Sequence, residues 1–161
     1  MIALAEEMNG PMTIGDISWQ RGGSSGSAQG TYNSFKIYMG LSSSDELTDT
    51  FESNYISGTR TLVYATSSQT MTAGPDEWMT IILDTPFQYN GTDNLVVEIQ
   101  WAGGSNMFYT YMWETGSNRG LMNKTNIGSP TGTLYTRMSE LMFTPESSLQ
   151  QYSFAYIKSL W

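Results

Sequence analysis

The fold of this chain is decided by residues 78–101, WMTIILDTPFQYNGTDNLVVEIQW, in which two β-prone runs flank the turn-rich sequence FQYNGTDN. Pro86 is expected to end the first strand, because proline has no backbone N–H to donate to a sheet. Asn90-Gly91 supplies the positive φ angles of a tight turn, and Asp93-Asn94 can hydrogen-bond to their own backbone. The stretch therefore predicts two strands joined by an ordered loop.

Two interpretations of this stretch are open. In the first, Trp78 and Phe87 are core residues, each of which buries about 150–250 Å². In the second, the aromatic and acidic residues of the loop contact a ligand. Residues 78–83 are apolar enough to be buried on both faces of a sheet. This favours a scaffold over a ligand-binding loop.

The composition limits the class of protein. The 161 residues suffice for one domain with a sizeable core, and only 14% of them are charged. Ser, Thr, Asn, Gln and Gly supply the polarity instead, which is typical of strands and turns. The net charge of −8 repels nucleic acid and anionic lipid, so neither is an expected partner. The chain contains no Cys and no His, which excludes thiol catalysis, His-based catalysis, disulfides and Cys/His zinc sites.

No apolar run in the sequence approaches the roughly 18 residues of a membrane span. The start, MIALAEEMNG, lacks the basic region and the long apolar region of a secretion signal. We expect an extracellular or cell-surface protein whose signal has already been removed from this chain.

Period-2 patterns dominate the rest of the chain and predict further strands. The predicted strands cover residues 12–21, 35–39, 61–65, 78–83, 95–99, 108–113 and 133–143. A break in the alternation near Gly15 predicts a β-bulge, and residues 1–8 fit either a strand or a helix. Since no βαβ alternation occurs, the pattern predicts an all-β, antiparallel, jelly-roll-like β-sandwich of about eight or nine strands.

At most one short helix is expected, in residues 44–51. Ser44 is the predicted N-cap, two acidic residues follow in the first turn, and Leu47 and Phe51 are spaced by four. The Gly/Ser-rich residues 21–33 are expected to form a loop.

The quoted stretch resembles a pattern from secreted prokaryotic cell-surface and adhesin-type proteins, in which W..I.L..PF.Y.G..NL.VEI recurs in jelly-roll-like β-sandwich modules. The matching residues include Trp78, Leu83, Pro86, Phe87, Tyr89, Gly91, Asn94, Leu95 and Val97. SFKIYMG (residues 34–40) and ISWQ (residues 17–20) are similar to two earlier strands of the pattern. The resemblance covers residues 1–145 and implies a spacer, an adhesive domain or an assembly subunit, with no catalytic residues.

Carboxylate pairs are the main remaining route to acid–base chemistry. Glu98 and Glu114 lie on predicted strands, and a glycosidase needs two carboxyl groups roughly 5–9.5 Å apart. Solvated strand faces explain both residues more simply, so we expect no catalytic residues and treat an acidic-residue glycosidase as the least favoured alternative.

A calcium site is a further hypothesis, because Ca²⁺ takes 6–8 oxygen ligands from carboxylates, carbonyls and water. Asp76 and Glu77, or Asp84 and Asp93, lie in or beside predicted loops that could supply them. Their spacing matches no EF-hand, and acidic turn residues are usually solvated.

Two glycosylation sequons occur, at Asn90 and Asn123. They bear on function only if the source organism glycosylates its proteins.

The aromatic run FYTYMW (residues 108–113) is the candidate binding surface. Tyr109, Tyr111 and Trp113 share one face of the predicted strand, whereas Phe108 and Met112 are core candidates on the other. Exposed rings can stack against sugars, so a carbohydrate-binding module is one interpretation. A core or an interface with another chain is the simpler one.

Residues 1–145 are expected to form the sandwich domain, and residues 146–161 a C-terminal extension. This extension has an amphipathic, aromatic pattern that predicts an additional strand in its own sheet, a strand docked on a neighbouring subunit, or the start of a following module. Its candidate assembly residues are Tyr152, Phe154, Tyr156, Ile157 and Trp161.

The function expected from these observations is that of a non-enzymatic extracellular structural or adhesive β-sandwich, and a self-assembling surface or filament subunit is one form that this function could take. Other copies of the chain, neighbouring surface modules or glycans are its expected partners, and no cofactor other than calcium is considered.

Overall fold

The alternating apolar residues of the long strands produce a sandwich-like arrangement of antiparallel sheets. The computed structural model describes residues 1–23 and 28–146. Its strands are β1 (Ile2–Ala3), β2 (Met12–Gln20), β3 (Gln29–Ser42), β4 (Thr61–Thr72), β5 (Trp78–Tyr89), β6 (Asn94–Gln100), β7 (Gly103–Ser105), β8 (Met112–Glu114), β9 (Gly120–Met122), β10 (Thr133–Tyr135), β11 (Arg137–Ser139) and β12 (Leu141–Pro145). The predicted all-β antiparallel class is confirmed.

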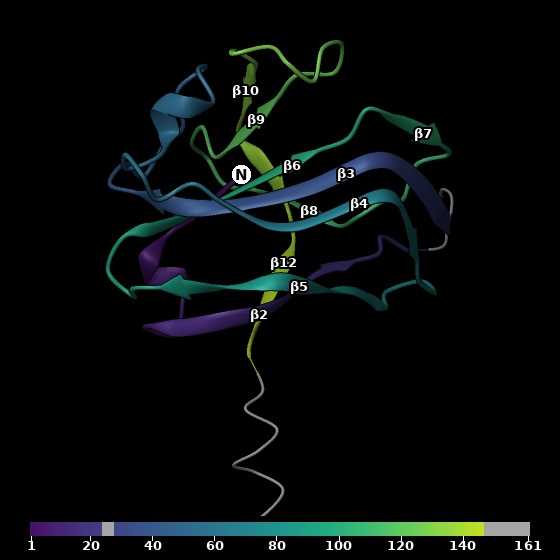
Figure 1. The fold of residues 1–161 in the computed structure, drawn as a ribbon, viewed down its shortest axis with the longest axis horizontal. Helices are drawn as coiled ribbons and strands as arrows, with labels where there is room; N and C mark the ends of the chain where they lie inside the picture. The colour runs from purple at the N-terminus through teal and green to yellow at the C-terminus, as the bar shows by residue number, and fades with distance from the viewer. Residues whose placement is uncertain (24–27, 147–161) are drawn as a thin grey trace, which may run out of the picture.

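Two larger sheets form the body of the molecule. One has the order β1-β6-β3-β4, with β7 also paired to β3, and the other has the order β12-β2-β5. In Figure 1 the β3–β4 layer lies above the β2–β5 layer, and β9 and β10 lie beyond the larger sheet. Two small sheets, β9–β10 and β8–β11, complete the set within the described residues.

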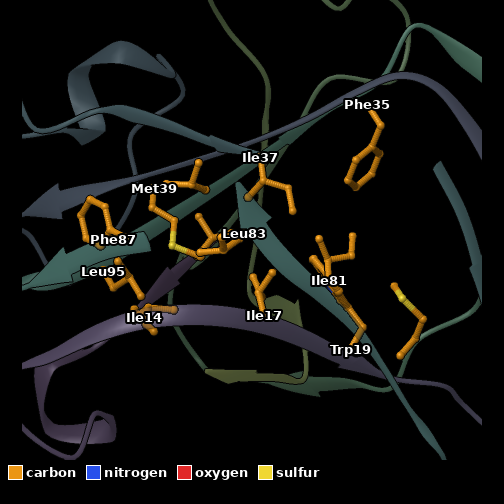
Figure 2. Packing of buried hydrophobic residues seen from close by; sticks show 14 of the residues in the cluster. Ile14, Ile17, Trp19, Phe35, Ile37, Met39, Ile81, Leu83, Phe87 and Leu95 are labelled. Carbon is orange, nitrogen blue, oxygen red and sulfur yellow. The ribbon is translucent and has the colours of Figure 1, made fainter. Parts of the chain in front are cut away.

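The main core lies between the two larger sheets. Figure 2 shows Ile14, Ile17 and Trp19 of β2 packed with residues of β3 and β5. Ile37 and Met39 of β3 are fully buried, as their alternation predicts. Phe87 is 6% exposed, so its predicted place in the core is confirmed.

The predicted bulge at Gly15 is also present. The pairing of β2 with β5 shifts register between Ile14 and Asp16, and that of β12 with β2 shifts at the same place. A Cβ atom on Gly15 would lie 2.7 Å from the Cα of Glu146. Glycine therefore leaves room for the residue that follows β12 to lie against the bulge in β2.

Three expectations for β5 were wrong. Trp78 is 37% exposed and Ile82 is 73% exposed, so only one face of this strand is buried. Pro86 does not end the strand, which continues to Tyr89. Its pairing with β2 passes from Ile82 directly to Phe87, and β5 lies at the edge of its sheet. A residue without an N–H is tolerated there because no ladder hydrogen bond is required of it.

The helix predicted in residues 44–51 is absent. The Ser44 hydroxyl accepts a hydrogen bond from the Glu46 backbone N–H and donates one to the Glu46 carbonyl, which closes a tight turn. Ser residues at such positions compete with helix formation through these local bonds. Leu47 is nevertheless buried. Helical structure in the described residues is limited to the 3₁₀ turns Ala5–Glu7 and Glu52–Asn54.

Two other predicted elements divide into shorter ones. The strand expected over residues 133–143 is three strands, β10, β11 and the first part of β12. Residues 1–8, left open between strand and helix, contain β1 and a 3₁₀ turn. Among the described residues, no helix is long and apolar enough to cross a membrane.

An additional layer covers the outer face of the larger sheet. Ile2, Leu47 and Val96 form a second, smaller buried cluster. Tyr55 from the connection between β3 and β4 packs against it, as does Leu121 of β9. This layer lies above β3 and β6 in Figure 1.

Candidate functional site: the exposed segment 107–113

Residues 107–113 carry the densest group of exposed large apolar side chains among the described residues. Their exposed fractions are 60% for Met107, 49% for Tyr109, 39% for Tyr111, 50% for Met112 and 46% for Trp113. Five such side chains within seven residues exceed the scattered exposed apolar residues that any soluble protein shows. The sequence prediction included the three aromatic residues but not the two methionines.

The backbone of this segment is held on both sides. Gly22 donates its N–H to the Tyr109 carbonyl at 3.0 Å, and Tyr111 donates its N–H to the Gln20 carbonyl at 3.0 Å. The Tyr111 carbonyl accepts a hydrogen bond from the Glu140 N–H at 2.9 Å. Met112 then enters β8, which pairs with β11. The segment thus links the end of β2 to the β8–β11 sheet, and its exposed side chains project from an ordered backbone.

The side chain of Tyr111 is fixed as well. Its hydroxyl donates a hydrogen bond to Asp76 Oδ1 at 2.5 Å. This bond and the negative charge of Asp76 raise the pKa of Tyr111. Asp76 itself has a positive φ of 62° in the turn between β4 and β5. The Asp76–Tyr111 bond therefore joins this turn to the exposed segment.

Trp113 lies against the cation of Arg119, whose guanidinium carbon is 5.3 Å from the ring centroid. Arg119 is 4% exposed and donates from Nε and Nη2 to the Ile2 carbonyl. Its guanidinium also forms an ion pair with Glu7. Burial opposes ionisation of Glu7, but the hydrogen bonds from Arg119 and the Leu4 backbone and the charge of Arg119 together lower its pKa. Trp113 therefore rests on a cation whose position is fixed by the Ile2 carbonyl and by Glu7.

The prediction that Phe108 and Met112 both face the core was half right. Phe108 is 7% exposed, and its N–H donates to the Tyr32 hydroxyl at 2.8 Å. Met112 is half exposed. The predicted strand 108–113 is not continuous, since β8 begins only at Met112 and Thr110 makes an isolated bridge to Arg21. The strict alternation on which the prediction depended is lost at this change of partner.

Glu98 is part of a separate polar cluster on the outer side of the larger sheet. Arg60 donates to both of its carboxylate oxygens at 3.0 Å, and the Tyr55 hydroxyl donates at 2.8 Å. The Arg60 guanidinium also lies 3.8 Å from the Tyr38 ring centroid. Burial disfavours the charged form, but the bonds from Arg60, Tyr55 and Gln100 and the charge of Arg60 outweigh it and lower the pKa of Glu98.

The two candidate glycosidase carboxylates occupy different sheets. Glu98 lies in β6 of the larger sheet, and Glu114 lies in β8, where it is exposed and forms a loose ion pair with Arg137 at 3.8 Å. A general acid at neutral pH requires a raised carboxyl pKa, and that of Glu98 is lowered. Its carboxylate is already fully engaged by donors.

The four candidate calcium ligands do not lie close together in one site. Asp76 and Glu77 precede β5 and Asp93 follows it, and a strand of this length spans roughly 40 Å. Asp84 lies within β5 and accepts the Ala65 N–H at 3.0 Å. No group of three potential metal-ligating side chains occurs in residues 1–23 and 28–146.

Both sequon asparagines take part in turns. Asn90 Oδ1 accepts the N–H groups of Thr92 and Asp93 beside Gly91, whose φ of 78° confirms the predicted tight turn. Asn123 Nδ2 donates to the Thr131 carbonyl. Asn94, expected to bond its own backbone, is instead buried and donates to the Ser44 carbonyl and to Asp45.

A shallow polar depression of about 380 Å³ lies beside the turn that contains Gly91. Leu4, Ala5, Ser42, Ser43, Thr92 and Asn94 line it, together with the carboxylates of Glu6, Asp45 and Asp93. Its walls offer no exposed aromatic side chain. It is therefore a weaker candidate for a binding site than the segment 107–113.

Arg60 and Arg119 organise the two polar clusters, and neither was identified from the sequence. The only signal was the excess of fifteen acidic over seven basic residues, which leaves every arginine with many possible partners. The candidate assembly residues Tyr152, Phe154, Tyr156, Ile157 and Trp161 lie outside the described residues. Comparison with protein-family models, with curated proteins and with solved structures gives no match for this chain.

Proposed function

We propose that this chain is a non-enzymatic β-sandwich module of the extracellular surface, which acts in adhesion or surface structure by binding other macromolecules. The observation that carries the proposal is the exposure of five large apolar side chains in residues 107–113 on a hydrogen-bonded backbone. A rigid, exposed, aromatic surface binds a partner at low entropic cost, because little further ordering is needed. Tyr, Trp and Met are enriched in such interfaces.

The ordering of Tyr111 and Trp113 supports the same function. Tyr111 is tied to Asp76 and Trp113 lies on Arg119, so both rings are held near one position before a partner arrives. The extracellular location is proposed from the resemblance to surface modules.

A protein partner, either another copy of the chain or a neighbouring surface module, is favoured over a glycan. Met107 and Met112 are flexible and apolar, which suits an adaptable protein contact. A carbohydrate-binding module remains the second candidate, since the exposed rings of Tyr109 and Trp113 offer apolar faces to sugars. An acidic-residue glycosidase is the third, and the engaged carboxylate of Glu98 disfavours it.

The experiment compares the wild-type protein with a Tyr109→Ala/Trp113→Ala double variant and with an Ile127→Ala control. Ile127 is 50% exposed but lies outside the segment. We expect the double variant to lose self-association, measured by sedimentation velocity, or adhesion to immobilised protein from the same cell surface, by at least about tenfold, which is 1.4 kcal/mol. The Ile127→Ala variant should bind like the wild type.

Unchanged binding by the double variant would contradict the proposal. Binding on a glycan array that disappears only in the double variant would replace the protein partner by a sugar. Hydrolysis of a polysaccharide that Glu98→Gln or Glu114→Gln abolishes would contradict the non-enzymatic assignment.

A further inference from the structure

The side of the β12-β2-β5 sheet that faces away from the core carries several exposed apolar side chains and is uncovered in the described residues. Residues directly opposite each other in an antiparallel pair lie on the same face, and Ser18 is opposite both Thr80 and Met142. Trp78 and Ile82 lie on this face too, because each is two residues from Thr80. We call it the open face.

Three large apolar side chains on the open face are exposed: Trp78 at 37%, Ile82 at 73% and Met142 at 40%. Between them, the hydroxyls of Ser18 and Thr80 bond to each other at 2.8 Å. The hydroxyl groups at the centre of the open face are therefore already hydrogen-bonded to each other and need no further polar partner. The outer face of the larger sheet, in contrast, is covered by the layer that contains Tyr55 and Leu121.

The chain leaves the sheet at a corner of this face. The last described residue, Glu146, donates its N–H to the Thr13 carbonyl at 2.7 Å, four residues after Met142. The fifteen residues that follow, SSLQQYSFAYIKSLW, contain seven large apolar residues. At up to ~3.5 Å per residue they reach about 50 Å, which exceeds the roughly 40 Å length of β5.

The charges of residues 147–161 and of the open face are also complementary. Lys158 is the one charged residue in 147–161, and the chain as a whole has a net charge of −8. Asp16 lies opposite Ile82, so a carboxylate lies on the open face beside its most exposed apolar side chain.

We propose that residues 147–161 dock on the open face of their own chain and cover Trp78, Ile82 and Met142 as the outer layer of the smaller sheet. This proposal is independent of the binding function assigned to residues 107–113. It assigns to the same chain the strand-like extension that the sequence pattern left open between an internal and an intermolecular partner.

The first test is methionine oxidation by hydrogen peroxide in the full chain, followed by peptide mass spectrometry. Met142 and Met122 have nearly equal exposed fractions, 40% and 39%, so Met122 is the matched reference. Since oxidation follows exposure, docking should slow Met142 by about fivefold relative to Met122. A full-length Phe154→Ser/Tyr156→Ser/Trp161→Ser variant should bring the two rates together. Equal rates in the wild type would overturn the proposal.

The second test identifies the segment that covers the open face. Because the chain contains no cysteine, an introduced cysteine is its single site of thiol labelling. Ile82→Cys in the full chain is labelled with a benzophenone maleimide and irradiated, and Leu62→Cys, on β4 of the other sheet and 43% exposed, is the control. A cross-link from position 82 to residues 147–161 at monomer mass supports the proposal. A cross-link at dimer mass would place another copy on the face and overturn it, as would the absence of any cross-link to these residues.

Discussion

Side chains on the same strand differ sharply in burial, and therefore in how much they contribute to the stability of the fold. Phe87 is 6% exposed within the main core, and Ile82, five residues earlier on β5, is 73% exposed. Phe87→Ala should lower the free energy of unfolding by about 3–5 kcal/mol, because it removes buried contacts and leaves a cavity. Leu62→Ala, on β4 of the other sheet and 43% exposed, should change it by less than about 1 kcal/mol. Urea denaturation of both variants checks this, and equal losses would mean that Phe87 does not lie in the core.

The ion pair of Glu98 makes stability depend on pH. Its pKa is lowered from the ordinary 4.5 in the folded protein, so ionised Glu98 stabilises the fold. That contribution is complete above the unfolded-state pKa and is lost as pH falls through the lower folded-state value. Glu98→Gln should cost about 1.5–3 kcal/mol at pH 7, and the difference from wild type should shrink below about pH 4.

The matched control for this variant is Glu114→Gln. The side chains of Glu114 and Arg137 are 69% and 56% exposed and 3.8 Å apart, so its loss should cost less than about 0.5 kcal/mol. A difference between wild type and Glu98→Gln that is constant from pH 3 to pH 7 would contradict the role of the carboxylate charge.

Alternation in the sequence indicates which side chains share a face, but it does not say which face is covered. On β3, where Ile37 and Met39 alternate with polar residues, the prediction was correct. On β5 both faces carry apolar residues, so the sequence could not show that Trp78 faces outward. Glu98 and Arg60 are 38 residues apart, and no local pattern connects such a pair.

At the scale of elements, the turn between β5 and β6 is sensitive to substitution. Gly91 has a φ of 78°, and a Cβ atom on it would lie 2.4 Å from the Pro11 nitrogen. Gly116 has a similar φ of 76°, but nothing lies within 4 Å of its Cβ position. Gly116→Ala should therefore show only the left-handed backbone penalty of about 1–2 kcal/mol. Gly91→Ala should lose more, because Pro11 must also move.

Thermal unfolding of the two alanine variants measures the difference. Equal melting temperatures would show that the close approach of Pro11 to the turn does not exist in solution.

Turns were predictable where a short motif has one main structural outcome, as with Asn90-Gly91. The prediction failed where a motif is compatible with two structures. Ser44 followed by acidic residues fits a helix N-cap and a tight serine turn equally well, and the structure has the turn. Pro86 likewise ends a central strand but is tolerated at the edge position that β5 occupies, and the sequence does not reveal strand order.

At the scale of the molecule, period-2 alternation and the lack of long helical patterns were enough to predict an all-β class. The layer over the larger sheet was not predictable, because it brings Ile2, Leu47 and Val96 together from distant parts of the chain. Segment 107–113 was predicted only in part, since a change of strand partner interrupts its alternation.

The central claim is that all the large apolar side chains of residues 107–113 except that of Phe108 form an exposed surface outside the core. Methionine oxidation of the native chain tests this claim most directly. Met107 and Met112 are 60% and 50% exposed, whereas Met39 and Met79 are 0% and 7% exposed. Under native conditions Met107 and Met112 should oxidise at least about tenfold faster than Met39 and Met79, because oxidation follows exposure, and all four rates should converge in urea. Native protection of Met107 and Met112 equal to that of Met39 would place the segment in a covered core and contradict the account.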